Sequence, residues 1–385
     1  MSKRLRLILG IAVSLFFLWL TVRNIKWREL GALFLQVNYF YLLPGLLLVV
    51  FTSWARAYRW RLLMYPSDIA TTGGAATGYG GAQPLGRIFH IVNIGYFFNN
   101  VFPAKAGELV RAYLAGRMLP GGIGQAISTL LIERLLDVLS LVLITLLLIP
   151  VLLSQQVPVP DWAVKGGLLF GGVAVAGTVV LLVLSRLGER GVEWIWRWVG
   201  RIPLIGHPRV KAVLQNLLAG FRVLSEVRVL PGILLGSAMV WCGYALLNYV
   251  LLAAFRMAPL PFSTPPGEQA LPFSATVLVL CATGFGMVLP SSPGAVGVFE
   301  WAAVQALLVY GVDQSRAFGY ALGLHLFTNV VLILLGLLGL FVEGLSYADI
   351  RRQVADSAAP PTGGHPPHAA DTAGVSSSHQ RRNVP

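Results

Sequence analysis

The stretch "NNVFPAKAGELVRAYLAGR", residues 99–117, follows an apolar run with no polar loop between the two. Two helix-breaking residues interrupt it, Pro103 and Gly107. Its charged side chains lie where a membrane helix would otherwise continue: Lys105, Glu108, Arg111 and Arg117. The question is whether these charges lie at a helix end at the membrane–water interface or form a site inside the membrane.

A second stretch, "VLPSSPGAVGVFE" at 288–300, repeats the pattern of an apolar pair, a proline, three residues and a glycine. Broken helices in corresponding halves of a chain are typical of a binding site near the bilayer midplane, because unwound backbone at that depth must be buried or line a cavity. We therefore predict two re-entrant, broken helical hairpins in an internal inverted repeat. The predicted break residues are Asn100, Pro103, Gly107, Pro290, Ser292, Pro293, Gly294 and Gly297.

The composition agrees with a membrane protein. Of 385 residues, 56% are hydrophobic and only 12% are charged, whereas about a quarter of a soluble domain is charged. Apolar runs near the length of roughly 20 residues that a bilayer requires occupy 5–22, 40–55, 135–153, 167–185, 230–255, 271–289 and 319–342. We predict an all-α polytopic helical bundle over 1–350, with a retained first span. The Pro/Gly/Ser-rich segment 351–385 is expected to be a disordered tail.

The net charge of +13 comes from basic residues between the apolar runs. This distribution favours the positive-inside rule over nucleic-acid binding. The basic stretches "MSKRLR" and "RAYRWR" (56–61), and the long connection 186–228, are expected in the cytoplasm together with both termini, in a multi-pass protein of the cell membrane. Within that connection, "GVEWIWRWVGR" is typical of a helix at the headgroup boundary. The Gly/Ala/Thr-rich stretch 67–86 predicts a flexible cytoplasmic loop.

Cysteine and histidine positions indicate no metal or redox chemistry. Cys242 and Cys281 both lie inside apolar runs, which argues against a disulfide framework or a zinc site. Three of the six histidines lie in the tail. No cofactor and no metal are expected.

The second break predicts a helix that starts after Ser292, because a serine N-cap followed by Pro293 at the first helical position is a strong start signal. The free N–H groups of this helix would attract an anion. Glu300 would then lie about two turns into the helix among apolar neighbours. It must pair with a basic residue from elsewhere or be protonated.

The first break is followed by two charged groups. Lys105, Glu108 and Arg111 follow one side of a helix, so Glu108 can neutralise either neighbour. Glu133 and Asp137 share a helix face, where like charges repel unless a cation or a proton lies between them. A charge at the bilayer centre costs about 2.5–3.5 kcal/mol, which favours a shared cavity for Glu108, Arg111 and Glu300. Snorkelling at a boundary remains an equal alternative for Arg117 and Arg134.

At these residues the chain resembles the membrane domain of lysylphosphatidylglycerol synthases, a family that includes stand-alone flippase-like proteins. The resemblance rests on "GYFFNNVFPAKAGELVRAYLAGR", "ERLLD" (133–137), "LPSSPGAVGVFE" and "YGV" (310–312), within a similarity over about 5–345. It implies a bundle with two re-entrant hairpins that moves a lipid headgroup between leaflets. The cavity residues that it implies are Pro103, Gly107, Glu108, Arg111, Glu133, Arg134, Asp137, Pro290, Gly294, Gly297 and Glu300.

One departure from the family concerns the last span, where related chains often carry a basic residue and this one has "LHLFTN", with His325 and Asn329. His325 is therefore added to the candidate site. The bifunctional members also carry a soluble aminoacyl-transferase domain, which is not expected here because only the tail follows residue 350.

The favoured function is a lipid transporter in which Lys105, Arg111 and Arg134 receive a phosphate while Glu108, Glu133 and Glu300 balance or gate them. The alternatives are a membrane-embedded transferase with Glu133 or Asp137 as base, and an accessory protein in the synthesis of lipids, lipid-linked glycans or hopanoids. Expected partners are lipids with an anionic or phosphate-bearing headgroup, and either a second copy of the chain or a biosynthetic enzyme.

Overall fold

The computed structural model describes residues 3–23, 25–65, 83–102, 106–158, 228–260, 270–287 and 292–346, together with isolated residues and short pieces between 161 and 215. Side chains are described from residue 12 onward. The predicted tail 351–385 lies outside these residues. So do most of the predicted span 167–185, most of the connection 186–228, including Trp194 and Trp198, and residues 67–82 of the predicted loop 67–86. The last two residues of that loop, Leu85 and Gly86, belong to a helix.

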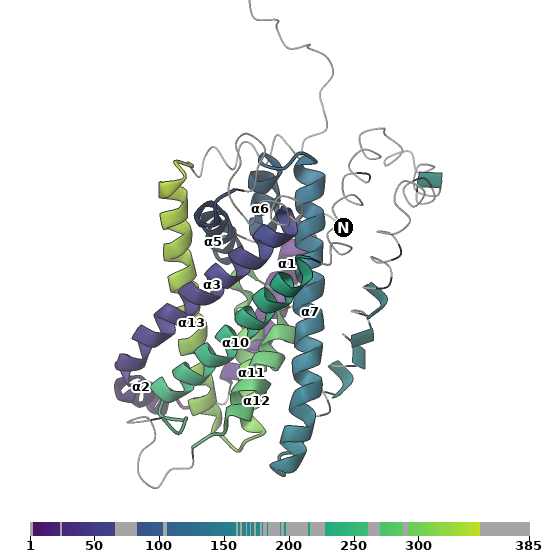
Figure 1. Ribbon diagram of the computed structural model, residues 1–385. Helices are drawn as coiled ribbons and strands as arrows, with labels where there is room; N and C mark the ends of the chain where they lie inside the picture. Colours follow the sequence, from purple (N-terminus) through teal and green to yellow (C-terminus); the bar gives the residue numbers. More distant parts are fainter. Residues whose placement is uncertain are drawn as a thin grey trace, which may run out of the picture.

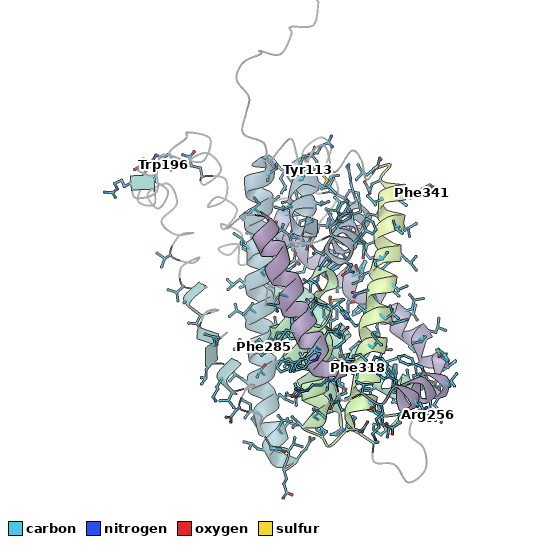
Figure 2. The ribbon with its side chains drawn as sticks, turned by 180° about the vertical axis from the view of Figure 1, so that it is seen from behind. Tyr113, Trp196, Arg256, Phe285, Phe318 and Phe341 are labelled. Carbon is cyan, nitrogen blue, oxygen red and sulfur yellow. The ribbon has the colours of Figure 1, made fainter. Side chains whose placement is uncertain are left out.

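All regular structure among the described residues is helical, as predicted. Four segments are long and apolar enough to cross a membrane: Tyr39–Met64, Gly122–Ser154, Leu230–Ala254 and Gln314–Val342. The exposed side chains agree with a lipid-facing surface, since Leu147 is 64% exposed and Phe341 is 84% exposed. Figure 2 shows Tyr113 and Phe341 near one end of this bundle and Arg256 near the other.

The chain is built from two halves of like architecture. In the first half, the long helices α3 (Leu42–Met64) and α7 (Gly122–Ser154) flank the shorter α5 (Leu85–Val101) and α6 (Ala106–Gly116). In the second half, α10 (Leu230–Ala254) and α13 (Gln314–Val342) flank α11 (Phe273–Gly286) and α12 (Val298–Leu308). In Figure 1, α3 ascends where α10 descends, and α7 descends where α13 ascends. The halves therefore form the predicted inverted repeat.

The two inner pairs are re-entrant hairpins. With a rise of 1.5 Å per residue, the 11 residues of α6 and of α12 span only about 17 Å, against about 30 Å for the bilayer core. The hairpin α5–α6 lies at the upper end of α7 in Figure 1, and the hairpin α11–α12 lies beside the lower half of α7. Each hairpin therefore enters from one end of the bundle and returns to it.

Three N-terminal elements complete the described fold. α1 (Lys3–Val22) packs against α12 and leads down to the short α2 (Trp27–Gln36) at the lower end of the bundle, which the 3-10 turn η1 (Tyr39–Tyr41) joins to α3. A second 3-10 turn, η3 (Pro293–Ala295), precedes α12.

The buried apolar side chains form two clusters, and each draws on helices of both halves. The first includes Trp60, Ile94, Leu114 and Ile132, and the second includes Leu251, Val279, Val304 and Leu324. Between the halves, α3 and α10 pack closely because Gly236 of α10 faces Arg59 of α3, where a Cβ atom would lie 2.9 Å from the Arg59 Cβ atom. Small residues at such crossings allow helices in membranes to approach.

Candidate functional site

Two arginines that the sequence suggests are in a loop lie inside a helix. The predicted span 40–55 ended before "RAYRWR", but α3 continues to Met64 and takes in the whole basic stretch. Arg56 is 5% exposed and Arg59 is fully buried. The prediction was wrong because a basic run beside an apolar run resembles a cytoplasmic loop, whereas here the two arginines have acidic partners on α7.

Glu133 and Asp137, one turn apart on α7, do have a cation between them. Arg56 Nη1 lies 2.8 Å from Glu133 Oε1 and 2.9 Å from Asp137 Oδ2. Arg59 Nη2 lies 2.6 Å from Asp137 Oδ1, and its Nη1 donates to Ser237 Oγ of α10 at 3.1 Å. The predicted span 135–153 also began too late, because α7 starts at Gly122 and includes both carboxylates.

Arg111 approaches the same carboxylate from α6. Its Nη2 lies 2.7 Å from Glu133 Oε2, and its guanidinium stacks 4.2 Å above the Trp60 ring. Trp60 Nε1 donates to Thr129 Oγ1 of α7 at 3.0 Å, which fixes the ring. Glu108 is therefore not the partner of Arg111, contrary to the neighbour pairing predicted from spacing.

Glu108 pairs instead with Arg134 of α7, with 3.2 Å between Arg134 Nε and Glu108 Oε1. Arg134 Nη1 also lies 3.5 Å from Asp137 Oδ2. This edge is more open than the interior, because the side chains of Arg134 and Glu108 are 44% and 34% exposed. Arg117 is exposed at the end of α6.

We call these seven residues the arginine cluster: Arg56, Arg59, Arg111, Arg134, Glu108, Glu133 and Asp137. Four guanidinium groups face three carboxylates, so the cluster carries one net positive charge. Among the described residues, the buried Nε atoms of Arg56, Arg59 and Arg111 have no hydrogen-bond acceptor. The cluster therefore has both charge and donors available for an anion.

The α5–α6 hairpin places Arg111 by a close helix crossing. Asn99 Oδ1 accepts from the Gly107 N–H at 2.9 Å. A Cβ atom on Gly107 would overlap the Gly95 carbonyl oxygen, and one on Gly95 would lie 2.5 Å from Arg111 Cγ. Two glycines are thus needed for the hairpin to close and for Arg111 to reach α7.

The second break differs from the predicted helix start. Gly294 and Gly297 have positive φ angles of 66° and 89°, and these left-handed turns prevent a helix from continuing after Pro293. α12 begins at Val298, with Gly297 and not Ser292 as its N-cap. Glu300 therefore lies in the first turn of α12 and not two turns into it.

Glu300 has a partner on α13. Its Oε1 lies 2.6 Å from His325 Nδ1, and its Oε2 accepts from the Gly297 N–H at 2.6 Å. The Phe299 ring stacks on the imidazole at 4.2 Å between centroids. The carboxylate and the imidazole are 3% and 8% exposed. The predicted shared cavity would bring Glu300 together with Glu108 and Arg111, but Glu300 pairs with His325. Glu108 and Arg111 pair with Arg134 and Glu133 of α7 instead.

The tips of the two hairpins lie close together. A Cβ atom on Gly294 would lie 3.6 Å from Asn329 Nδ2 of α13 and 3.9 Å from the Asn100 carbonyl oxygen of α5. The Ser292 N–H donates to Ser14 Oγ of α1 at 2.8 Å. The candidate residues Pro103, Lys105 and Pro290 lie outside the described residues.

The family described as "Lysylphosphatidylglycerol synthase TM region" matches residues 7–336. This range contains both hairpins, the arginine cluster and the Glu300–His325 pair. The chain belongs to this family. It is similar to a UPF0104 membrane protein of Methanocaldococcus jannaschii, with 23% identity over 252 residues that cover 64% of this chain and 94% of that protein. It is also similar to a UPF0104 membrane protein of Methanothermobacter thermautotrophicus, with 24% identity over 239 residues that cover 60% and 67% of the two chains.

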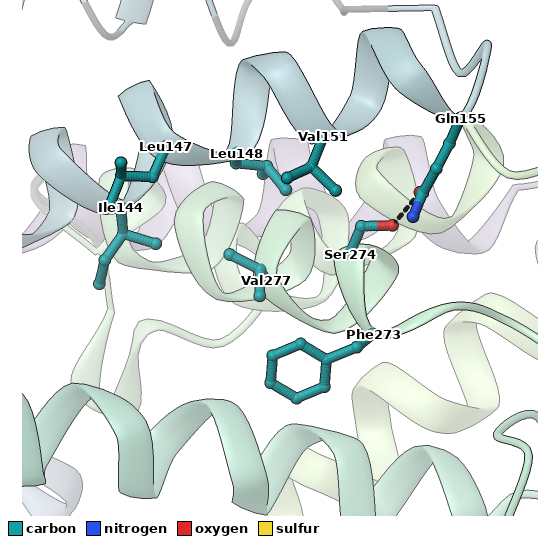
Figure 3. A pocket seen from close by; sticks show the side chains of 8 residues that line it. All are labelled: Ile144, Leu147, Leu148, Val151, Gln155, Phe273, Ser274 and Val277. Carbon is teal, nitrogen blue, oxygen red and sulfur yellow. Dashed lines mark hydrogen bonds between the residues drawn. The ribbon is translucent and has the colours of Figure 1, made fainter.

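In this member of the family, a groove of about 310 Å³ lies between α7 and α11, apart from the arginine cluster and the Glu300–His325 pair. Figure 3 shows its apolar lining, including Leu148 and Val277. Its polar end is closed by Ser274 Oγ, which donates to Gln155 Oε1 at 2.5 Å and accepts from the Tyr310 hydroxyl at 2.9 Å. None of the predicted site residues lines this groove.

Sequence reasoning missed Arg56, Arg59 and Trp60 in the first half of the chain. A helical reading of 42–64 would have revealed them, because Arg56, Arg59 and Trp60 then share one side of a helix that is otherwise apolar. An arginine on such a helix needs an acidic partner. Glu133 and Asp137, which needed a cation between them, were the natural candidates.

Proposed function

We propose that this protein is a lipid transporter of the flippase type, which moves a lipid with a phosphate-bearing headgroup between leaflets. One observation carries the proposal, the buried arginine cluster with its single excess positive charge. Charges at membrane depth are expensive and commonly mark a substrate path. Arginine also binds phosphate through two parallel hydrogen bonds, and three buried Nε donors in the cluster lack an acceptor among the described residues.

The mechanism that we propose is exchange of anions. While no lipid is bound, the carboxylates of Glu133 and Asp137 pair with the arginines. Arg56 contacts both carboxylates and offsets the repulsion between them. An arriving phosphate takes over donors of Arg56 and Arg111. Glu108 and Arg134, at the more exposed edge, are the first charges that a headgroup meets.

The hairpins supply the path for the headgroup. They enter from opposite ends of the bundle and approach each other at Gly294 and Asn100. Because α6 and α12 are short, one hairpin at a time can move while the long helices stay in place. A ligand shifts such an equilibrium only by binding one state better than the other, and the excess positive charge gives an anionic headgroup that preference.

We also propose that this protein resides in the cell membrane and that both of its termini face the cytoplasm. In Figure 1, α1 begins and α3, α6 and α13 end toward the upper end of the bundle, and α2 lies at the lower end. Basic residues at those upper helix ends include Lys3, Arg4 and Arg6 of α1, Arg61 of α3 and Arg117 after α6, and those at the lower end include Lys26 and Arg28 around the start of α2 and Arg256 after α10. The positive-inside rule assigns the more basic end to the cytoplasm.

The test is translocation of fluorescent phosphatidylglycerol in phosphatidylcholine vesicles that contain the purified full chain. We expect Arg111→Ala and Glu300→Ala to slow translocation about 10-fold or more, the equivalent of one charge-assisted hydrogen bond. Lys26→Ala, at a side chain that is 67% exposed, is the matched control for loss of a cation.

The folded state is checked by gel filtration, and Arg111→Lys keeps the charge if Arg111→Ala misfolds. Wild-type rates of translocation and binding in both alanine variants would refute the role of these residues. Product formation by the purified protein from a labelled lipid and a group donor would instead favour the transferase.

A further inference from the structure

In each hairpin, an acidic side chain of the second helix pairs with a basic side chain of the long helix that follows. In the first, Glu108 in the first turn of α6 pairs with Arg134 of α7 at 3.2 Å. In the second, Glu300 in the first turn of α12 pairs with His325 of α13 at 2.6 Å. We call these pairs the first latch and the second latch. Each joins the start of a hairpin's second helix to the first half of the long helix that follows it, so the inverted repeat makes them equivalent.

The two latches differ in the base that they use. Arginine stays charged at every physiological pH, so the first latch is a permanent ion pair. Histidine is the side chain whose charge ordinarily changes between about pH 5 and 8, so the second latch can exist in a charged and an uncharged form. The second latch is also far more buried, at 8% and 3% exposure against 44% and 34%.

The charged groups on the elements packed against α12 and α13 are engaged elsewhere or lie at the ends of the bundle. Glu29 of α2 pairs with Lys26, and Arg87 of α5 pairs with Glu343. Arg56 and Arg59 of α3 belong to the arginine cluster, Arg61 donates to the Gln83 carbonyl, and Arg28 and Arg316 lie at the starts of α2 and α13.

The remaining titratable side chains on those elements are thiols, phenols and one imidazole. They are Tyr58 on α3, His90 and Tyr96 on α5, Cys242, Tyr244 and Tyr249 on α10, Cys281 on α11 and Tyr320 on α13. The described part of α1 from Ala12 to Val22 has none. Tyr320 donates to Asn248, and the His90 carbonyl lies beside Gly339, near the far end of α13. His325 is therefore the base in hydrogen-bond contact with Glu300.

We propose that the Glu300–His325 pair is a proton-binding site that controls the α11–α12 hairpin. An ionised Glu300 can only accept hydrogen bonds, so a neutral imidazole 2.6 Å away carries its proton on Nδ1 and donates it to Oε1. The incoming proton binds Nε2, and no other bond forms or breaks. The pair then becomes imidazolium and carboxylate, so an attraction between two opposite charges is added to the hydrogen bond that already joins the ring to the carboxylate.

Proton uptake thus tightens the second latch, and proton release loosens it, while the first latch is unaffected. This inference rests on the proposed function only in that hairpin movement is a step of lipid transport. It adds a coupling ion to that transport, namely the proton.

The experiment is hydrogen–deuterium exchange of the full chain in detergent at about pH 6 and about pH 8, which bracket the ordinary titration of histidine. The α6 peptide 106–116 serves as an internal control for the α12 peptide 298–308, because both experience the same intrinsic change in exchange rate. We expect the protection of α12 relative to α6 to fall several-fold as the pH rises through this range.

Two variants distinguish an effect of proton binding at His325 from a general effect of pH on the fold. His325→Arg reproduces the first latch and should keep α12 protected at both pH values, whereas His325→Gln should leave it weakly protected at both. An unchanged α12-to-α6 ratio in the wild type would overturn the proposal, as would a pH response of wild-type size that persists in either variant. Because exchange needs no transported lipid, a wild-type pH response without translocation of phosphatidylglycerol would contradict the transporter proposal and leave the proton site standing.

Discussion

Replacing Glu133 with glutamine tests whether the arginine cluster is held together by charge. Glu133 forms ion pairs with Arg56, at 2.8 Å between Oε1 and Nη1, and with Arg111, at 2.7 Å between Oε2 and Nη2. Its side chain is fully buried. Glutamine keeps the volume and one oxygen acceptor, so packing changes little. The net charge of the cluster rises from one to two positive charges. Removing one partner of a buried ion pair typically costs about 3–5 kcal/mol, and we expect a loss of that size in the free energy of unfolding.

The assay is unfolding of the purified protein by sodium dodecyl sulfate in mixed detergent micelles, followed by tryptophan fluorescence. The matched control is Asp161→Asn, which also neutralises an acid paired with a cation, Lys165 at 3.3 Å, but with side chains 90% and 78% exposed. An exposed pair contributes about 0–1 kcal/mol, so the control should barely shift the transition.

A double variant sharpens the result. When Arg111→Gln is added to Glu133→Gln, an unpaired buried charge is removed, and we expect the combined loss to be smaller than the sum of the two single losses by about 0.5–3 kcal/mol. If Glu133→Gln costs no more than Asp161→Asn, or if the two single losses add, the cluster is not the ion-pair network argued above.

The remaining predictions concern packing and a buried hydroxyl. Gly107→Ala should destabilise the protein by about 1–3 kcal/mol through overpacking of the α5–α6 crossing, whereas Gly31→Ala in α2, where nothing lies within 4 Å of the added Cβ atom, should not; the same detergent titration measures both. Tyr320→Phe removes a buried hydroxyl that donates to Asn248 and should cost about 1 kcal/mol, while Tyr39→Phe, at an exposed tyrosine, should cost less; equal losses would contradict the difference in burial.

The fold was predictable where the sequence contained interruptions. The matched spacing of "VFPAKAG" and "VLPSSPG" led to two hairpins in an inverted repeat, because prolines and glycines unwind an apolar helix and unwound backbone at membrane depth must be buried in protein or line a cavity. The extents of the helices were harder to predict. α3 continues through Arg56 and Arg59, and a charge inside a span is tolerable only with a partner, which sequence alone does not locate.

The candidate site was predictable in its components and less so in its pairings. The i, i+4 spacing of Glu133 and Asp137 required a cation, but Arg56 reaches them only through the packing of α3 against α7. The depth of Glu300 was misjudged because the turns at Gly294 and Gly297 delay the helix start. Neighbours in sequence were poor guides to partners, since Glu108 and Arg111 each pair with α7 rather than with each other.

The unequal chemistry of the two halves bears on the direction of the proposed transport. Two identical inverted halves would make both faces of the membrane equivalent, and such a protein could only equilibrate its lipid. Here the first half holds the arginine cluster with its excess positive charge, and the second half holds the buried Glu300–His325 pair. In the proposed mechanism, the anion therefore binds the first half and the proton binds the second. Because each ligand biases a different hairpin, a difference in pH across the membrane would favour one sequence of hairpin movements over its reverse.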